Sequence, residues 1–274
     1  MKKIILAFDG IMFSEGAFAF ARRMNELAPV LVVGVFVPQV SYAGMWSYGV
    51  VAGAPSYLPL QETETGDIIR QNIQRFETLC QENGMRSHVH KDFFDFALPE
   101  LLRETRFADL LVISSEQFYQ HLGDEPASDY MRELLTKAEC PVVIVPEDVC
   151  FPTKTILAYD GSASSVYAVK QFAYLFRELS LNETLLVFMK EDADEKFPEE
   201  HNIMELASEH FPMLELFKLD INPRKYFNQW VLENKDAILV SGAFSRSIFS
   251  QLLRKSFITD VIAEHKLPVF IAHR

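Results

Sequence analysis

The sequence predicts an α/β protein built from two tandem, doubly wound parallel sheets of five strands each. Short β-branched runs alternate with longer helical patterns, this alternation occurs twice, and the two halves repeat each other's sequence at both ends. Strand–helix alternation is typical of parallel sheets that are covered by helices on both faces. At 274 residues the chain also exceeds the usual size of one hydrophobic core, which favours two domains.

Ten short apolar runs are predicted to be strands, five in each half. Those of the first half are Lys3–Phe8, Val30–Val37, Ser87–Lys91, Asp109–Ile113 and Pro141–Val145. Those of the second half are Lys154–Tyr159, Glu183–Met189, Leu214–Leu219, Ala237–Val240 and Pro268–Ala272. Between them, apolar residues recur at intervals of three and four, which predicts amphipathic helices. One such stripe consists of Phe172, Leu175, Phe176 and Leu179.

The repeat is visible where each half begins and where it ends. Residues 3–10 read KIILAFDG and residues 154–161 read KTILAYDG, while CPVVIV at 140–145 corresponds to LPVFIA at 267–272. Agreement at both ends indicates a duplicated unit. The polar segment between the copies contains two prolines, and such segments are typical of domain boundaries. We therefore predict domains at residues 1–148 and 152–274.

An insertion at residues 38–60 distinguishes the first half from the second, which has only an acidic connection at 190–200. The insertion is rich in Gly and Pro and carries the aromatic residues Tyr42, Trp46, Tyr48 and Tyr57. Aromatic side chains on such a loop are suited to folding over a ligand or contacting a partner subunit. They are equally suited to packing back on the first domain, and both interpretations stay open.

Charge and composition exclude several classes of function. The net charge is −12, so the summed field repels nucleic acid rather than attracting it. The apolar run that follows Met1 ends after five residues at Asp9, which is too short for a signal peptide, and no other run is long enough to span a membrane. Three cysteines without CxxC spacing favour reduced thiols over a disulfide framework or a zinc site. We therefore expect a soluble, cytoplasmic protein.

Both halves resemble the universal stress protein family over nearly their whole length. Asp160-Gly161-Ser162 matches the Asp-Gly-Ser that follows the family's first strand, whereas the first half keeps Asp9-Gly10 and has Ser14 at the helix start. The resemblance implies a sheet of strand order 3-2-1-4-5, like that of the adenine nucleotide alpha hydrolases. It also implies that the two domains pack as an intramolecular pseudo-dimer, in the manner of a family homodimer, with further homodimerisation left open.

The strand order implied by this resemblance predicts where a ligand would bind. Open parallel sheets bind ligands beyond the carboxyl ends of their strands where the strand order reverses, here after strands one and four of each half. Nucleotide-binding members of the family carry a glycine-containing phosphate loop there. Of the three glycines of that loop, the second half keeps one, Gly242. The candidate nucleotide or anion site consists of Asp160, Gly161, Ser162, Gly242, Ser245, Arg246, Ser247, Lys255 and Ser256.

Two interpretations of the Ser245 region stay open. A serine followed by a cation at a helix start offers a cap, a positive charge and backbone amides for an anion. Alternatively, Ser245 only caps the last long helix. The first half departs further from the family, because residues 114–125 have no glycine in place and bring carboxylates to the position of the phosphate. Like charges repel there, so we predict that the first half binds no nucleotide.

No catalytic constellation can be assigned from the sequence. No serine lies in a Gly-x-Ser-x-Gly elbow, and His88 and His90 share one face of a predicted strand without the thiolate or carboxylate neighbours of a metal site. The leading hypothesis is a non-enzymatic stress-response binding or signalling protein that binds ATP, with Mg²⁺, or another anion in its second domain. The alternatives are a slow metal-dependent ATP hydrolase and an interaction module with vestigial crevices.

Overall fold

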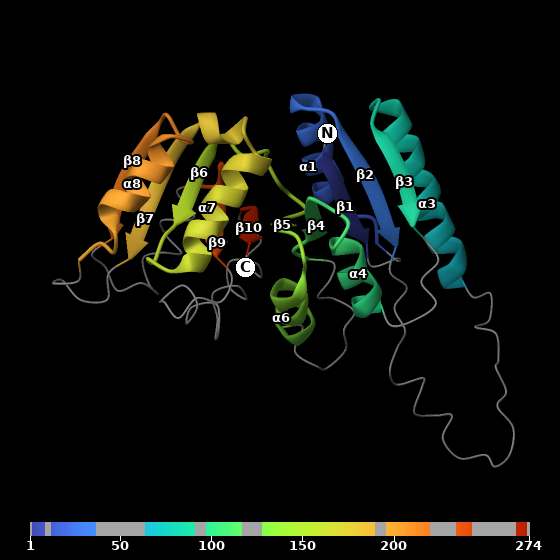
Figure 1. Cartoon of the computed structure of the whole chain (residues 1–274). Helices are drawn as coiled ribbons and strands as arrows, with labels where there is room; N and C mark the ends of the chain where they lie inside the picture. The colour runs from blue at the N-terminus through green and yellow to red at the C-terminus, as the bar shows by residue number, and fades with distance from the viewer. Residues whose placement is uncertain are drawn as a thin grey trace, which may run out of the picture.

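The computed structural model describes residues 2–8, 12–36, 64–90, 97–116, 128–189, 196–219, 234–242 and 267–272. Figure 1 shows a single sheet that runs across the molecule from β8 and α8 at one end to β3 and α3 at the other. Its centre is formed by β4, β5, β10 and β9.

The first half alternates strands and helices as the sequence predicts. Its elements are β1 (Lys2–Phe8), α1 (Glu15–Leu27), β2 (Val30–Phe36), α3 (Glu64–Glu82), β3 (Arg86–His90), α4 (Ala97–Thr105), β4 (Leu110–Ser114), α6 (Ser128–Lys137) and β5 (Val142–Val145). The second half repeats the pattern. Its elements are β6 (Lys154–Ala158), α7 (Ala163–Leu175), the 3-10 turn η1 (Leu179–Leu181), β7 (Glu183–Met189), α8 (Glu200–Ser208), β8 (Leu214–Leu219), β9 (Ala237–Gly242) and β10 (Val269–Ala272).

The strand order confirms the predicted fold class. The sheet runs β3-β2-β1-β4-β5-β10-β9-β6-β7-β8, so each half has the order 3-2-1-4-5 when its strands are counted from its own start. Within each half all pairs are parallel. The strand order therefore reverses next to β1 in the first half and next to β6 in the second.

The two sheets that the sequence predicts in series are joined into one sheet of ten strands. Strand β5 pairs with β10 in the antiparallel sense, and Val143 lies opposite Phe270. These two residues are each other's counterparts in the sequence repeat, so the halves are related by an approximate two-fold axis at this pair. The sequence could not predict this joint, because an edge strand has no sequence signal for the partner that covers it.

Side chains of the strands alternate between two apolar layers. Ile4, Leu6 and Phe8 of β1 contribute to a layer that also contains buried residues of α1, α3, α7 and α8. Ile5 and Ala7 point to the other face, where they join residues of α4 and α6. Helices thus cover both faces, as expected for parallel sheets.

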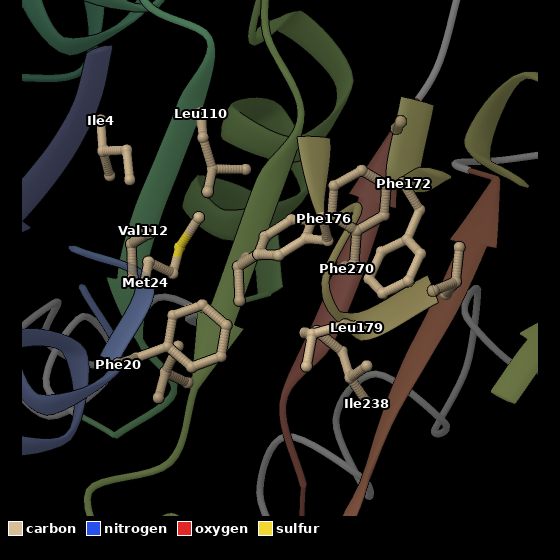
Figure 2. Packing of buried hydrophobic residues seen from close by; sticks show 14 of the residues in the cluster. Ile4, Phe20, Met24, Leu110, Val112, Phe172, Phe176, Leu179, Ile238 and Phe270 are labelled. Atoms are coloured by element: carbon tan, nitrogen blue, oxygen red, sulfur yellow. The ribbon is translucent and has the colours of Figure 1, made fainter. Parts of the chain in front are cut away.

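The layer under α1 and α7 is continuous across the joint (Figure 2). Phe20 of α1 lies 6.2 Å from Phe176 at the end of α7, and Phe176 lies 5.7 Å from Phe270 of β10, both measured between ring centroids. The Lys2 ammonium donates a hydrogen bond to the Leu175 carbonyl, at the C-terminal end of α7. The predicted boundary between residues 148 and 152 therefore crosses a shared core, and the division into two domains stays a prediction.

The stripe that contains Phe172 and Leu179 does not belong to a single helix. Helix α7 ends at Leu175, Phe176 is its C-cap, and Leu179 begins η1. The backbone N–H of Ser180 still donates to the Phe176 carbonyl, so the chain keeps nearly helical spacing and the stripe stays directed at the core. The periodicity predicted the buried face correctly but missed the end of the helix.

Candidate functional site

The turn between β6 and α7 is shaped by Asp160, Gly161 and Ser162. The Asp160 carboxylate accepts a hydrogen bond from the Ser162 backbone N–H at 2.8 Å. Gly161 has a φ of +78°, and a Cβ there would lie 2.6 Å from the Cβ of Pro198, so this position requires glycine. Ser162 is the N-cap of α7, and its hydroxyl accepts from the Ser165 N–H at 3.1 Å.

Gly242 lies directly against the first turn of α7. A Cβ on Gly242 would be 2.4 Å from the carbonyl carbon of Ser164 and 2.5 Å from the nitrogen of Ser165. The glycine at this position therefore allows the backbones of β9 and α7 to approach closely. The structure brings Gly242 together with the Asp160–Ser162 turn, but the same contact covers the end of β9 with a turn of helix.

A cavity of about 480 Å³ opens between α7 and α8. It is lined by Tyr159, Gly161, Ala163, Val166, Tyr167, Lys170, Glu199, Asn202, Ile203 and Leu206. The lining residues of α7 recur at intervals of three and four, so they lie on one face of that helix. The lining residues from Glu199 to Leu206 recur in the same way on α8. The cavity therefore lies between these two helix faces. Gly161 and Ala163 place the start of α7 at its wall, and Lys170 adds a cation.

Tyr159, directly after β6, is the most deeply buried aromatic residue that lines this cavity. It is 1% exposed, its ring stacks on Phe197 with 5.3 Å between centroids, and its hydroxyl donates to the Pro198 carbonyl at 3.1 Å. Burial raises the pKa of the Tyr159 phenol, and the carboxylates of Glu199 and Asp160 raise it further. Tyr159 therefore stays a neutral hydrogen-bond donor throughout the physiological pH range.

In the first half, the end of β4 is occupied by the carboxylate of Glu147. One carboxylate oxygen accepts from the Ser14 hydroxyl at 2.5 Å and from the Ser114 hydroxyl at 2.7 Å. The other accepts from the Gly16 N–H at 3.0 Å. The Ser14 hydroxyl also accepts from the Ala17 N–H and so caps α1. The carboxylate thus fills the reversal point of the first half.

Glu147 is a site residue that the sequence analysis missed. It lies next to the predicted domain boundary at residue 148, where an acidic residue has no distinguishing pattern. The glycine at position 16 is a partial signal in the sequence for this contact. A Cβ there would lie 2.1 Å from the Pro146 oxygen and 2.8 Å from the Glu147 Cα, so the close approach of this backbone requires glycine. Of the carboxylates predicted at residues 114–125, the described residues include Glu116, which accepts from the Glu147 N–H at 3.3 Å, and the rest of that prediction stays a prediction.

Several predicted positions lie outside the described residues. They are Ser245, Arg246, Ser247, Lys255 and Ser256 of the candidate anion site, Asp9 and Gly10 of the first half, and the insertion at 38–60. The predictions for these residues stay predictions. Of the nine candidate site residues, the structure places Asp160, Gly161, Ser162 and Gly242, and these four lie in one neighbourhood.

Within the described part of the chain, no group of three or more His, Cys, Asp or Glu side chains could hold a metal ion. The His90 imidazole instead lies 2.9 Å from the Glu104 carboxylate, a neighbour that is distant in sequence. Burial raises the pKa of the Cys80 thiol to about 11 and that of Cys140 to about 12, so both stay thiols at neutral pH. No helix of the described residues is long and apolar enough to cross a membrane.

The strand order and the covering helices correspond to those of known structures. A universal stress protein from Archaeoglobus fulgidus DSM 4304 superposes with a TM-score of 0.69 at 14% identity, over 100% of this chain and 96% of that chain. The chain has the fold of the universal stress proteins. A candidate universal stress protein from Pseudomonas aeruginosa UCBPP-PA14 matches with a TM-score of 0.50 at 10% identity, over 100% of this chain and 93% of its own.

A functionally unknown protein from Pseudomonas aeruginosa PAO1 has the same fold, with a TM-score of 0.53 and 9% identity over 100% of this chain and 92% of that chain. No protein-family model matches the sequence, and no curated protein sequence matches it. At these identities the likeness establishes the universal stress protein fold, and it extends over both halves of the chain.

Proposed function

We propose that this chain is a stress-response binding protein of the universal stress protein type whose second half binds a nucleotide, ATP or AMP, or a related small anion. The observation that carries the proposal is the cavity between α7 and α8, whose wall includes Gly161 and Ala163 at the start of α7. N–H groups of the first helical turn have no acceptor within the helix and favour negative charge.

The chemistry of the cavity suits a ligand with an apolar ring and an anionic end. Val166, Ile203 and Leu206 supply apolar surface, while Lys170 and Asn202 supply polar groups. A cavity that is mostly apolar with a few placed polar groups is the usual form of a small-molecule site. The Glu199 carboxylate, next to α8, would repel the anionic group of a ligand. We therefore expect the anionic group of the ligand to lie against α7.

The first half provides an internal contrast. Its own carboxylate, Glu147, fills the position over β4, whereas the residue that follows β10 at the same interval is Arg274. This correspondence rests on strand pairing, because Val145 lies beside Ser114 as Ala272 lies beside Gly242. The sequence repeat thus replaces an acidic residue by a basic one at this interval, and Arg274 itself lies outside the described residues.

Calorimetric titration with ATP and with AMP tests the proposal. We expect one site per chain, a rise in melting temperature with ligand, and weaker binding in Lys170→Glu, which reverses a charge at the cavity wall. Arg106→Glu is the matched control, because Arg106 pairs with Glu139 on the surface of the first half. The absence of both heat and thermal shift at millimolar nucleotide would remove the nucleotide part of the proposal.

The same titration separates binding from turnover. A binding protein returns the ATP unchanged after prolonged incubation with Mg²⁺, and release of phosphate that Lys170→Glu abolishes would favour the slow hydrolase instead. We infer a binding role because no nucleophile and base are brought together among the described residues that line the cavity. We also propose a cytoplasmic location, which cell fractionation would test.

A further inference from the structure

The contacts of Glu147 have the form of a ligand in a binding site. Three donors from two elements of the first half converge on its carboxylate: the hydroxyl of Ser14 and the N–H of Gly16 at the start of α1, and the hydroxyl of Ser114 at the end of β4. Ser14 and Ser114 are both 0% exposed. Hydrogen bonds to a carboxylate are stronger than those between neutral groups, so this arrangement stabilises the negative charge.

The position of the carboxylate follows from the fold rather than from the linker. Ser14 and Gly16 begin α1, and Ser114 ends β4, so the donors meet where the strand order of the first half reverses. The N-terminal end of a helix favours an anion there. The two buried hydroxyls, supplied by two different elements, distinguish this site from an ordinary helix start.

We propose that the first half contains a small-oxyanion site, formed by Ser14, Gly16 and Ser114, in which Glu147 is a tethered carboxylate ligand. The site accepts a free carboxylate or phosphate when the Glu147 side chain is removed. Glu147 is half-buried and lies beyond the end of β5, so removal of its side chain leaves the strand intact. This inference concerns the first half and does not rest on nucleotide binding by the second.

The site is also selective by its size. A Cβ on Gly16 would meet the Pro146 oxygen at 2.1 Å, so the 146–147 backbone covers one side of the carboxylate. Glu116 accepts from the Glu147 N–H and adds a negative charge nearby. Both features favour a singly charged, compact anion such as acetate over a polyphosphate chain, which agrees with the prediction that the first half binds no nucleotide.

Chemical rescue of Glu147→Ala tests the inference. The substitution removes the carboxylate that accepts from the Ser14 and Ser114 hydroxyls, and we expect the melting temperature to fall by at least about 5 °C. Sodium acetate at constant ionic strength should restore much of this loss, with phosphate as a second arm, and should raise the melting temperature of the wild-type protein less than that of the variant, because any general salt effect acts on both. Restoration by either anion supports the site, whereas equal restoration by chloride contradicts it.

Two controls keep the test decisive. Glu139→Ala removes a surface carboxylate that pairs with Arg106, and acetate should not restore the stability lost in that variant. The double substitution Glu147→Ala with Ser114→Ala should lose the rescue, because one donor is gone. If Glu147→Ala gives no folded protein, Ser114→Ala alone should lower the melting temperature by about 2–4 °C. A Ser114→Ala variant as stable as the wild type would overturn the inference.

A result for this site is distinguishable from one for the second half. Lys170→Glu should leave the acetate rescue of Glu147→Ala intact, and Glu147→Ala should leave the stoichiometry of ATP binding at one. Rescue without nucleotide binding retains the first-half site alone. Nucleotide binding without rescue retains only the proposed function of the second half.

Discussion

In the first half β4 ends at Ser114, whose side chain contacts the Glu147 carboxylate, while in the second half β9 ends at Gly242, which contacts the first turn of α7. The two positions are counterparts, because β1 and β6 pair with these strands in the same register. One half fills the reversal point with a side chain from elsewhere, and the other fills it with helix backbone. The same fold thus presents α1 to an internal anion and α7 to a cavity.

A second difference between the halves is the packing around the aromatic residue at the end of the first strand, Phe8 in β1 and Tyr159 after β6. Phe8 of β1 stacks on Phe13 and Phe36 at 4.9 and 4.8 Å, and Phe76 of α3 meets it edge-on. Gly34 makes room for Phe76, since a Cβ there would lie 2.9 Å from that ring. In the second half α8 has 9 residues against 19 in α3, and the cavity opens beside Tyr159, the counterpart of Phe8.

The largest expected effect comes from Phe270→Ala at the joint. The Phe270 ring is 0% exposed and lies 5.3 Å from that of Phe172, so its loss should cost about 3–5 kcal/mol. Because the core is continuous, scanning calorimetry should show one transition shifted to lower temperature. A shift of only one of two transitions would show that the halves unfold independently. Phe107→Ala, at a side chain 64% exposed, should stay within about 0.5 kcal/mol.

Gly242→Ala sharpens the comparison of the two strand ends. The new methyl group would press on the backbone of Ser164, and we expect a loss of about 1–3 kcal/mol in denaturant unfolding. Gly66→Ala in α3 is the control, since a Cβ there meets nothing within 4 Å, and it should be neutral or stabilising by up to about 1 kcal/mol. If Gly242→Ala changed the free energy of unfolding no more than Gly66→Ala, the described close contact of β9 with α7 would be contradicted.

Exchanging the counterparts Phe8 and Tyr159 should give unequal effects, of which that at Tyr159 is the smaller. Phe8→Tyr places a hydroxyl in a packed aromatic cluster and should cost about 1–3 kcal/mol. Tyr159→Phe loses one hydrogen bond to the Pro198 carbonyl and should cost about 0.5–1.5 kcal/mol. Equal losses of unfolding free energy in urea would contradict the proposed difference between the packed surroundings of Phe8 and the cavity beside Tyr159.

The same Tyr159→Phe variant carries a pH signature. The pKa of Tyr159 is raised in the folded state, so the unfolded chain releases this proton first as the pH rises. The stability that the neutral phenol contributes is complete below the unfolded value of about 10 and is lost as the pH rises toward the folded value. The free energy of unfolding, measured from pH 9 upward, should therefore fall less steeply with pH in Tyr159→Phe than in the wild type.

Local patterns in the sequence were sufficient for the fold class and for part of the candidate site. All ten predicted strands are present, and the repeat of KIILAFDG as KTILAYDG identifies β1 and β6 as the corresponding first strands of the two halves. Ser14 caps α1, and Asp160 to Ser162 form the turn before α7, because caps and tight turns depend on residues adjacent in the chain. Hydrophobic alternation likewise determines which face of each strand is buried.

The tertiary structure alone decided how distant segments meet. It joined β5 to β10 edge to edge, placed Glu147 over the start of α1, and left the facing stripes of α7 and α8 apart. Each of these features depends on the distance between elements that are far apart in sequence, and on which side chains fill the space between them. A residue type records its preference for burial or charge but not the partner it will meet, so these contacts have no signal in a single sequence.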